Sequence, residues 1–307
     1  MSLVFITEQL LNGIGYGLML FLLAAGLTLV FGIMDVMNLA HGSLFMGGAY
    51  VAARAQAHTG SFALACLLAV LAMALVAVLV EQLLVRRLYK ADHLVQVLAT
   101  FGMILVADDV VKMIWGASPM MIALPESLSG PVQLLPGLMY PSFRLLIIGA
   151  GLLIALGLYL LVSHTRVGML VRAGTSNRWM AQLMGVRVAR VFTNVFVLGA
   201  MLAALAGALM GPLVAVQIGM GEEILIPALV VIVIGGIGSV RGAFLASLMV
   251  GVVDISARAF LPSLLKLAMP GPLAADLGAT FSALSMYLLM ALVLLFKPSG
   301  LFSERSA

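Results

Sequence analysis

The polar residues with the clearest chemical potential interrupt long apolar runs. In the segment Phe31 to Tyr50, FGIMDVMNLAHGSLFMGGAY, Asn38 and His41 stand between two such runs and Gly42 follows at once. Amide and imidazole groups at such a break hydrogen-bond a zwitterionic solute or the backbone groups of an interrupted helix. We therefore take Asn38, His41 and Gly42 as candidate residues of a substrate path. The alternative is a polar turn, Asp35 to Ala40, that joins two helices at the membrane surface.

The sequence lacks spacings typical of catalytic or metal-binding sites. Cys66 is the single cysteine, which excludes an intrachain disulfide, and no second metal ligand lies near His41. The segment Gly235 to Gly251, GGIGSVRGAFLASLMVG, is similar to a glycine-rich phosphate loop. No Lys-Ser/Thr follows it, however, and its surroundings are apolar. We expect no enzyme activity, and neither a metal nor a cofactor bound by this chain.

The same glycine-rich segment is typical of close helix packing. Small residues recur in it at spacings of four, which lets neighbouring helices approach each other. Clustered glycines also allow a tight turn with positive φ angles. The residues that we assign to this packing turn are Gly235, Gly236, Gly238, Ser239 and Gly242.

A third interruption, TRVGMLVRAGTSNRWMAQLMGVRVAR over 165–190, is the most polar stretch of the chain. Ser176 or Asn177 is a suitable N-cap for a short helix, and Gly185 is a suitable residue to end it. Met180, Leu183 and Met184 then share one face. Such an amphipathic helix either lies on the lipid surface or docks in a groove of a soluble partner, and the pattern alone favours neither.

The composition defines the class of protein that must position these segments. Hydrophobic residues make up 64% of the 307 residues, charged residues only 9%, and the mean hydropathy is +1.21. Soluble domains carry roughly a quarter charged residues, so lipid must solvate much of this chain. The net charge of +4 comes from basic residues scattered between apolar runs, which does not indicate nucleic-acid binding.

Nine apolar segments are long enough, or nearly so, to cross a membrane. They cover 10–33, 41–57, 61–84, 94–115, 143–163, 191–213, 222–238, 242–260 and 277–296. The second, seventh and eighth are short or glycine-rich, so we expect eight to ten spans in one all-α membrane domain, residues 1–307. Basic residues concentrate in cytoplasmic connections, and an outside N-terminus places most of them there. The connection 165–190 is then cytoplasmic, and the loop 116–142 is extracytoplasmic.

Four of the charges inside the apolar segments are spaced as intrahelical pairs. Asp108 and Lys112 lie four residues apart, as do Asp254 and Arg258. Residues at this spacing share a helix face, so we expect each pair to neutralise itself.

Together the three interruptions resemble the branched-chain amino acid ABC transporter permease family of the LivH type. The resemblance covers nearly the whole chain. It runs from LLNGIGYGLMLFLLAAGLTLVFGIMDVMNLAHGSLFMGGAY through VEQLLVRRLY, LATFGMIL, TRVGMLVRAGTSNRWMAQLMGV and VVIVIGGIGSVRGAFLASLMVGVVD to LLFKPSGLF. The NLAHG and GGIGSxxGA motifs are fairly specific in combination, and their order and spacing also match.

The resemblance implies a helical permease of the type II importer class in the bacterial inner membrane. It implies a second homologous permease subunit as a heterodimer partner, two cytoplasmic ATPase subunits that bind ATP and Mg²⁺, and a periplasmic substrate-binding protein. It further implies that the cytoplasmic helix docks on the ATPase, which shifts the balance from lipid to partner. The coupling residues are then Arg172, Ala173, Ser176, Asn177, Met180, Leu183, Met184 and Gly185.

Some features depart from the family pattern. The stretch GEEILIPALVVIV is more acidic, with Glu222 and Glu223, and we expect Pro227 in the first turn of its helix. Asp108 and Asp109 have no assigned role. These departures leave the identity of the substrate open, with branched-chain amino acids, amides, urea and aromatic acids as the candidates. Two other classes remain as alternatives, a channel for a small solute such as urea and an ion-coupled secondary transporter.

Overall fold

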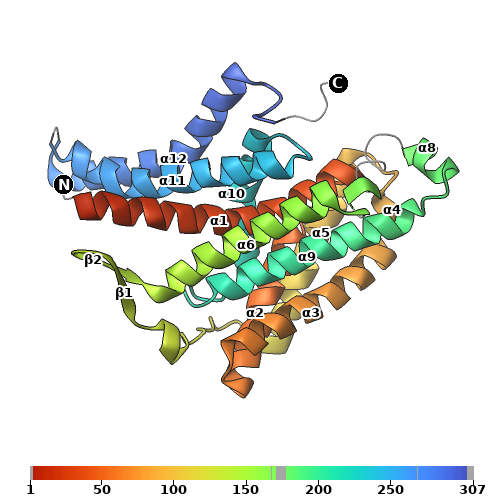
Figure 1. Cartoon of the computed structure of the whole chain (residues 1–307), viewed down its shortest axis with the longest axis horizontal. Coiled ribbons are helices and arrows are strands. Elements are labelled where there is room, and N and C mark those ends of the chain that lie inside the picture. The colour runs from red at the N-terminus through yellow and green to blue at the C-terminus, as the bar shows by residue number, and fades with distance from the viewer. Residues whose placement is uncertain (1–2, 167, 171–177, 268, 303–307) are drawn as a thin grey trace.

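Long helices run side by side along the long axis of the molecule (Figure 1). The structure is a computed structural model that describes residues 3–166, 168–170, 178–267 and 269–302. Its longer helices are α1 (Leu3–Met34), α2 (His41–Thr59), α3 (Phe62–Val80), α5 (His93–Trp115), α6 (Ser142–His164), α9 (Val188–Met210), α10 (Met220–Gly235), α11 (Val240–Leu265) and α12 (Gly271–Phe296). The shorter elements are η1 (Glu81–Val85), α4 (Arg86–Leu88), η2 (Glu126–Leu128), β1 (Pro131–Leu135), β2 (Leu138–Pro141) and α8 (Arg178–Leu183).

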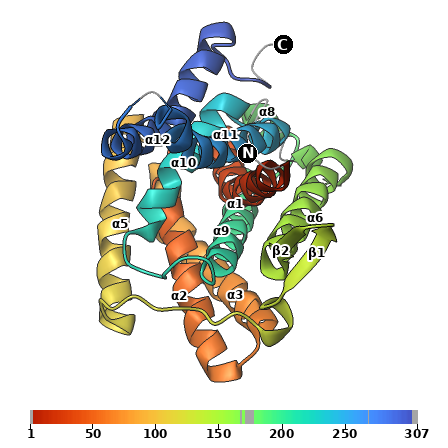
Figure 2. The ribbon, with the colours of Figure 1, turned by 90° about the vertical axis from the view of Figure 1, so that its left-hand side faces the viewer.

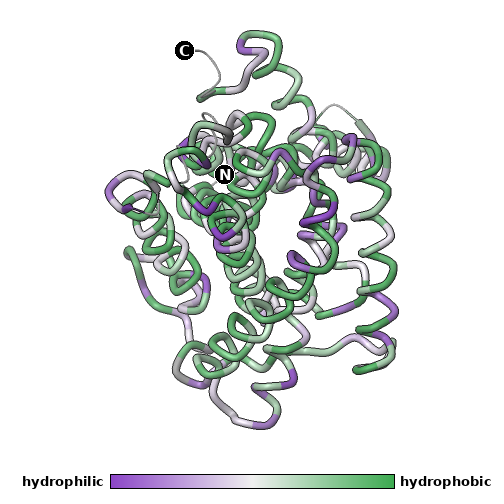
Figure 3. The backbone as a smooth tube through the Cα atoms, turned by 90° about the vertical axis from the view of Figure 1, so that its right-hand side faces the viewer, coloured by the Kyte–Doolittle hydropathy of each residue, from purple (hydrophilic) through white to green (hydrophobic). Residues whose placement is uncertain are grey.

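Seven described helical segments are long and apolar enough to span a membrane, namely α1, α3 with its continuation to Leu88, α5, α6, α9, α11 and α12. The two remaining long helices are α2, which is less apolar, and α10, which has only 16 residues. Each predicted apolar segment thus coincides with one helix. Apolar residues dominate these helices, interrupted by short hydrophilic stretches (Figure 3). The chain is therefore a multi-pass helical membrane protein, as predicted.

The bundle is organised around α1. In its most apolar stretch 89% of the residues are buried, against 67% in α9 and 11% in α12. Figure 2 shows α1 and α9 at the centre, with α5 and α6 at opposite edges. Helix α1 packs against α9, α10, α11 and α6, and α2 packs against α3, α9 and α10. The core thus lies where α1, α2, α9, α10 and α11 meet, and the other helices expose apolar side chains to the outside.

Glycines allow the central helices to touch through their backbones. A Cβ atom on Gly42 in α2 would lie 2.3 Å from the carbonyl oxygen of Gly221 in α10. A Cβ atom on Gly26 in α1 would lie 2.7 Å from the carbonyl oxygen of Gly199 in α9. Real Cβ contacts do not occur at such distances, so only glycine fits at these crossings.

The end of the bundle opposite α8 is covered by irregular segments. Strands β1 and β2 form an antiparallel hairpin in which Val132 pairs with Tyr140, with an irregular register between Gln133 and Leu135. The stretch after α5 crosses to the α9–α10 loop, where Met120 and Val216 exchange backbone hydrogen bonds of 2.9 and 2.8 Å. These elements lie in the loop predicted to be extracytoplasmic.

Helix α10 differs from the prediction at its start. It begins at Met220, so Pro227 lies about two turns inside the helix and not in its first turn. The predicted segment, 222–238, starts two residues after Met220, because Gly219, with a φ of 90°, and Gly221 precede it. A proline at this depth removes one backbone hydrogen bond and leaves the carbonyl oxygen four residues earlier, at Glu223, without its helical donor.

Candidate functional site

The break between α1 and α2 is a non-helical segment held in place by α5. Asp35 has a φ of 55°, which is unusual for a residue other than glycine. The backbone amide of Met37 donates a 3.0 Å hydrogen bond to Oε1 of Gln96 in α5. The side-chain amide of Gln96 in turn donates from Nε2 to the carbonyl oxygens of Leu88 and Ala91. Gln96 thus joins the break to the α4–α5 connection, and the Met37 amide, which has no helical acceptor in the break, has a hydrogen-bond partner.

The candidate path residues lie deep in the protein. Asn38 is 2% exposed and His41 is fully buried, and their side-chain nitrogen and oxygen atoms make no hydrogen bond to any described residue. The His41 ring lies between α1 and α9, because a Cβ on Gly26 would lie 2.9 Å from its Nε2.

Buried polar groups without partners carry a free-energy cost of about 1–3 kcal/mol each. Proteins tolerate this cost mainly at functional positions, so the geometry is compatible with a role for Asn38 and His41 in function. Gly42 meets Gly221 directly and serves packing. None of the three residues lines either of the two cavities described below. Their assignment to a substrate path stays a prediction.

Helix α8 presents an exposed apolar face. Met180, Leu183 and Met184 are 52%, 63% and 79% exposed, whereas Ala181 is buried against the chain. The helix ends at Leu183, and Gly185 follows with a φ of 84°, in the C′ position expected for it. The amides of Gly185 and Val186 donate to the carbonyl oxygens of Gln182 and Ala181, a pairing typical of glycine-terminated helices. Arg172, Ala173, Ser176 and Asn177, also predicted for this surface, lie outside the described residues.

A buried carboxylate that sequence reasoning missed joins α3 to α9 at the same end of the bundle. Glu81 is fully buried at the start of η1, a π-helical turn that continues α3. Its two oxygens accept from Arg86 at 3.3 and 3.1 Å, from the Tyr89 hydroxyl, and from the Thr193 hydroxyl of α9 at 2.8 Å. The Tyr89 ring also packs edge-on against Phe192, with centroids 5.3 Å apart. We call Glu81, Arg86, Tyr89 and Thr193 the Glu81 cluster.

The Glu81 cluster places a charge network where the chain leaves α8 and enters α9. In the sequence, the only indication of this cluster is that Glu81 precedes Arg86 by five residues. Side chains at this spacing meet in a π-helical turn, whereas in an α-helix they meet at spacings of three or four. Thr193 lies in the second turn of α9, so its hydrogen bond to Glu81 joins α3 to the helix that follows α8.

The glycine-rich turn between α10 and α11 brings the ends of these two helices together. Gly236 and Gly238 have φ angles of 95° and 86°, and the Ser239 side chain caps α11 by accepting from the Gly242 amide at 3.1 Å. A Cβ on Gly242 would lie 2.0 Å from the carbonyl oxygen of Gly235, so the ends of α10 and α11 touch through their backbones.

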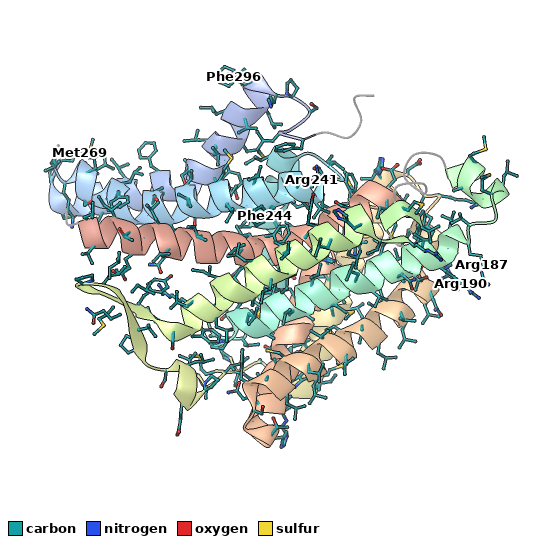
Figure 4. The ribbon with its side chains drawn as sticks, in the orientation of Figure 1. Arg187, Arg190, Arg241, Phe244, Met269 and Phe296 are labelled. Carbon is teal, nitrogen blue, oxygen red and sulfur yellow. The ribbon has the colours of Figure 1, made fainter. Side chains whose placement is uncertain are left out.

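Two cavities open between the helices. The larger, of about 800 Å³, lies between α1, α6 and α11 and has mainly apolar walls that include Phe244. Arg241 borders it and sits 5.0 Å from the ring centroid of Tyr159, a cation–π contact (Figure 4). The smaller, of about 320 Å³, is bordered by Asn12, which accepts hydrogen bonds from Tyr140 and Arg144. In neither cavity do side chains converge as catalytic residues would.

The two predicted charge pairs have different outcomes. Arg258 donates to Asp254 at 2.9 Å, which confirms that pair. The Asp108–Lys112 prediction is wrong, since no ion pair joins them within 4 Å. Their spacing permits contact, but Asp108 is half-buried and Lys112 is exposed, so the two side chains diverge. Among the described residues no group of three or more His, Cys, Asp or Glu side chains is arranged to hold a metal.

Comparison with known proteins assigns a family to this architecture. The family described as "Branched-chain amino acid transport system / permease component" matches residues 9–296. The high-affinity branched-chain amino acid transport system permease protein BraD of Pseudomonas aeruginosa is 30% identical over 97% of this chain and 95% of its own length. The permease protein LivH of Salmonella typhimurium is 26% identical over 98% and 96%, respectively. The probable permease protein LivH of Methanocaldococcus jannaschii is 28% identical over 80% of each chain.

No solved structure matches this chain. The sequence match nevertheless extends over almost every helix described above, including the break before α2, α8 and the α10–α11 turn. The chain therefore belongs to the family of branched-chain amino acid transport system permease components.

Proposed function

We propose that this chain is a transmembrane permease subunit of an ATP-driven ABC importer for branched-chain amino acids or similar small amino-acid-like solutes. It works in a bacterial inner membrane beside a second, homologous permease subunit. Two cytoplasmic ATPase subunits bind ATP and Mg²⁺, and a periplasmic binding protein delivers the solute. This chain binds no cofactor and performs no covalent chemistry.

The observation that carries the proposal is the exposed apolar face of α8. Three large apolar side chains, Met180, Leu183 and Met184, stand in a segment that is otherwise rich in arginine. Figure 4 shows Arg187 and Arg190 beside this segment, at the end of the bundle opposite Met269. An apolar helix face framed by arginines in the cytoplasm suits a groove on a soluble partner. The Glu81 cluster then transmits movement of α8 to α3 and α9.

The mechanism that follows is alternating access. Closure of the ATPase dimer on ATP displaces α8, and the displacement reaches α9 through the four-residue connection 184–187. Thr193 and Glu81 join the start of α9 to the end of α3, and Gln96 joins the α4–α5 connection to Met37 beside the α1–α2 break. The path between the two permease subunits thereby changes its open side.

The test replaces Met184 with glutamate. A carboxylate on the most exposed apolar residue of the α8 face must lose its hydration in a groove, so we expect recovery of the ATPase in pull-down to fall at least tenfold while membrane insertion persists. Met184→Leu is the conservative control. Leu267→Glu is the matched control, because Leu267 is 85% exposed near the far end of the bundle. Normal assembly and transport by Met184→Glu would overturn the proposal.

The two rival classes have their own signatures. Transport that survives depletion of ATP would favour a small-solute channel, which needs no α8 face. Transport that an uncoupler abolishes at constant ATP would favour an ion-coupled carrier, which needs a buried acid.

A further inference from the structure

The larger cavity runs along the second half of α1. Its volume is about 800 Å³, and its α1 wall extends from Phe21 to Ile33. With the rise of an α-helix this stretch is about 18 Å long, close to the roughly 15 Å of hydrocarbon in one leaflet of a bilayer. The α6 wall ends at Ser163, two residues before the connection 165–190, which we predict to be cytoplasmic. The cavity thus matches the cytoplasmic leaflet in length and position.

The rim of the cavity, between α6 and α11, is exposed. Both helices pack against α1 but make few contacts with each other. The floor is buried, because Phe21 is 1% exposed and its ring packs edge-on against Phe244, with centroids 5.3 Å apart. The rim includes the exposed leucines Leu152, Leu156 and Leu245. Since α6 and α11 are membrane-spanning helices, an opening between them faces the bilayer and admits an apolar chain.

The polar side chains of the cavity gather at its cytoplasmic end. Arg241 is exposed in the first turn of α11, with its guanidinium 5.0 Å from the ring centroid of Tyr159 (Figure 4). It pairs with no described acid, and the dipole of α11 disfavours a cation at this end of the helix. The hydroxyls of Ser163 and Ser239 border the same end. One cation and two hydroxyls, with no acid among the described lining residues, suit a phosphate group.

We infer that this cavity binds an anionic phospholipid of the cytoplasmic leaflet. The lipid phosphate accepts hydrogen bonds from Arg241 and the two serine hydroxyls, and an acyl chain lies in the apolar groove over Phe21 and Phe244. Basic pockets between transmembrane helices on the cytoplasmic side have the charge that anionic head groups require. An apolar helix of a protein partner would fill the groove but leave Arg241 without an anion.

This inference goes beyond the proposed function. It requires that the helices cross a bilayer with the connection 165–190 in the cytoplasm, and it requires neither an ATPase nor a particular solute.

The test titrates the purified full chain in detergent with phosphatidylglycerol and with phosphatidylcholine of identical acyl chains. Native mass spectrometry gives the dissociation constant of the first bound lipid. The parent should bind phosphatidylglycerol about fivefold more tightly, which is the effect of one basic residue near an anionic head group. This preference should disappear in Arg241→Gln and persist in Arg241→Lys. Arg54→Gln removes an equal charge from an exposed residue of α2 that lines neither cavity, so it should bind like the parent.

A second pair of variants tests the acyl chain. Leu156→Trp places a larger side chain at the groove, so it should weaken the binding of both lipids at least about fourfold, the effect of displacing one methylene group. Leu153→Trp is the matched control, because Leu153 is an exposed leucine of the same helix that lines neither cavity. It should bind both lipids like the parent.

A head group without chains completes the test. Glycerol 3-phosphate at equal concentration should not displace phosphatidylglycerol, and displacement would show a site for an anion alone and overturn the inference. Equal affinity of the parent for both lipids, or an unchanged preference in Arg241→Gln, would also overturn it. So would unchanged lipid binding in Leu156→Trp, and weaker association of that variant with a second permease subunit would then assign the groove to this partner. Failure of α8 docking would leave each lipid measurement unaffected.

Discussion

The interior of the bundle and the α8 segment use apolar residues in opposite ways. In the interior, small residues bring helices into backbone contact, as at Gly42 against Gly221 and Gly26 against Gly199. In α8, large apolar side chains such as that of Met184 are exposed. Close packing leaves no room for added atoms at the interior crossings. The small residues of the interior therefore determine how closely the helices of this chain pack. The α8 face is exposed, as the proposed interface with a partner requires.

The Glu81 cluster lies between these two regions. Its carboxylate, Glu81, is buried like the interior, and it accepts a hydrogen bond from Thr193 in the second turn of α9, the helix that follows α8. Its hydrogen-bonded carboxylate links the two regions through directional contacts, whereas the glycine contacts are purely steric. Substitutions in the three regions should therefore differ in kind as well as in size.

The largest effect is expected from a bulky side chain in the interior. Gly42→Leu places a Cβ 2.3 Å from the Gly221 carbonyl oxygen, and backbone cannot yield as a flexible side chain does. Overpacking of this kind costs about 1–3 kcal/mol or more, so we expect little folded protein. The measurement is the monodisperse yield and thermal unfolding of the purified chain.

A matched leucine tests whether the effect is local. Gly102→Leu introduces the same side chain in α5, where an added Cβ has no neighbour within 4 Å. It should fold normally, because leucine has a higher helix propensity than glycine. Equal stability of the two variants would remove the contrast between a rigid interior and its surroundings.

A smaller effect is expected where the two regions meet. Thr193→Val keeps the shape of the side chain but removes the hydroxyl that lies 2.8 Å from Glu81 and 3.0 Å from Arg86. Loss of a hydrogen bond to a charged group costs about 1.5–3 kcal/mol when buried, and the low end applies to this half-buried residue. Thermal unfolding should reveal it.

The same variant also tests the mechanical link. In the assembled transporter, Thr193→Val should raise the number of ATP molecules hydrolysed per solute imported, because α9 is less firmly joined to α3. Thr280→Val is the control, since that hydroxyl is exposed and bonds only within α12. A loss of stability without a change in the coupling ratio would assign the Glu81 cluster to folding alone.

The sequence predicted well those features that depend on neighbours along the chain. Apolar runs located each long helix, and the spacing of Met180, Leu183 and Met184 with Gly185 located α8 and its end. The glycine spacing of the α10–α11 turn predicted contacts that the structure contains. In each case the determining interaction is local or is a general property of the lipid solvent.

Features that depend on distant elements were missed. Asp108 and Lys112 are correctly spaced for a pair, but they form none, because Asp108 is half-buried while Lys112 is exposed, and spacing within one helix cannot show this. Glu81 finds Thr193 more than a hundred residues away through a π-helical turn that no periodic pattern predicts. The path residues Asn38 and His41 stay a prediction, because burial without partners does not name a ligand.

The smallest effect on folding is expected in α8 itself, from Gly185→Ala. The φ of 84° at Gly185 is disfavoured for a residue with a Cβ by about 1–2 kcal/mol. The strain is confined to the end of α8, where no Cβ clash arises, so the unfolding temperature of the bundle should not change. Met184 would leave its position next to the helix end, however, and ATPase recovery should fall by about fivefold to thirtyfold if all the strain appears in docking.

Gly157→Ala in α6, equally free of neighbours but helical, should leave both measurements unchanged. A Gly185→Ala chain that unfolds earlier but binds the ATPase normally would show that α8 belongs to the fold, which would end the contrast between the two regions.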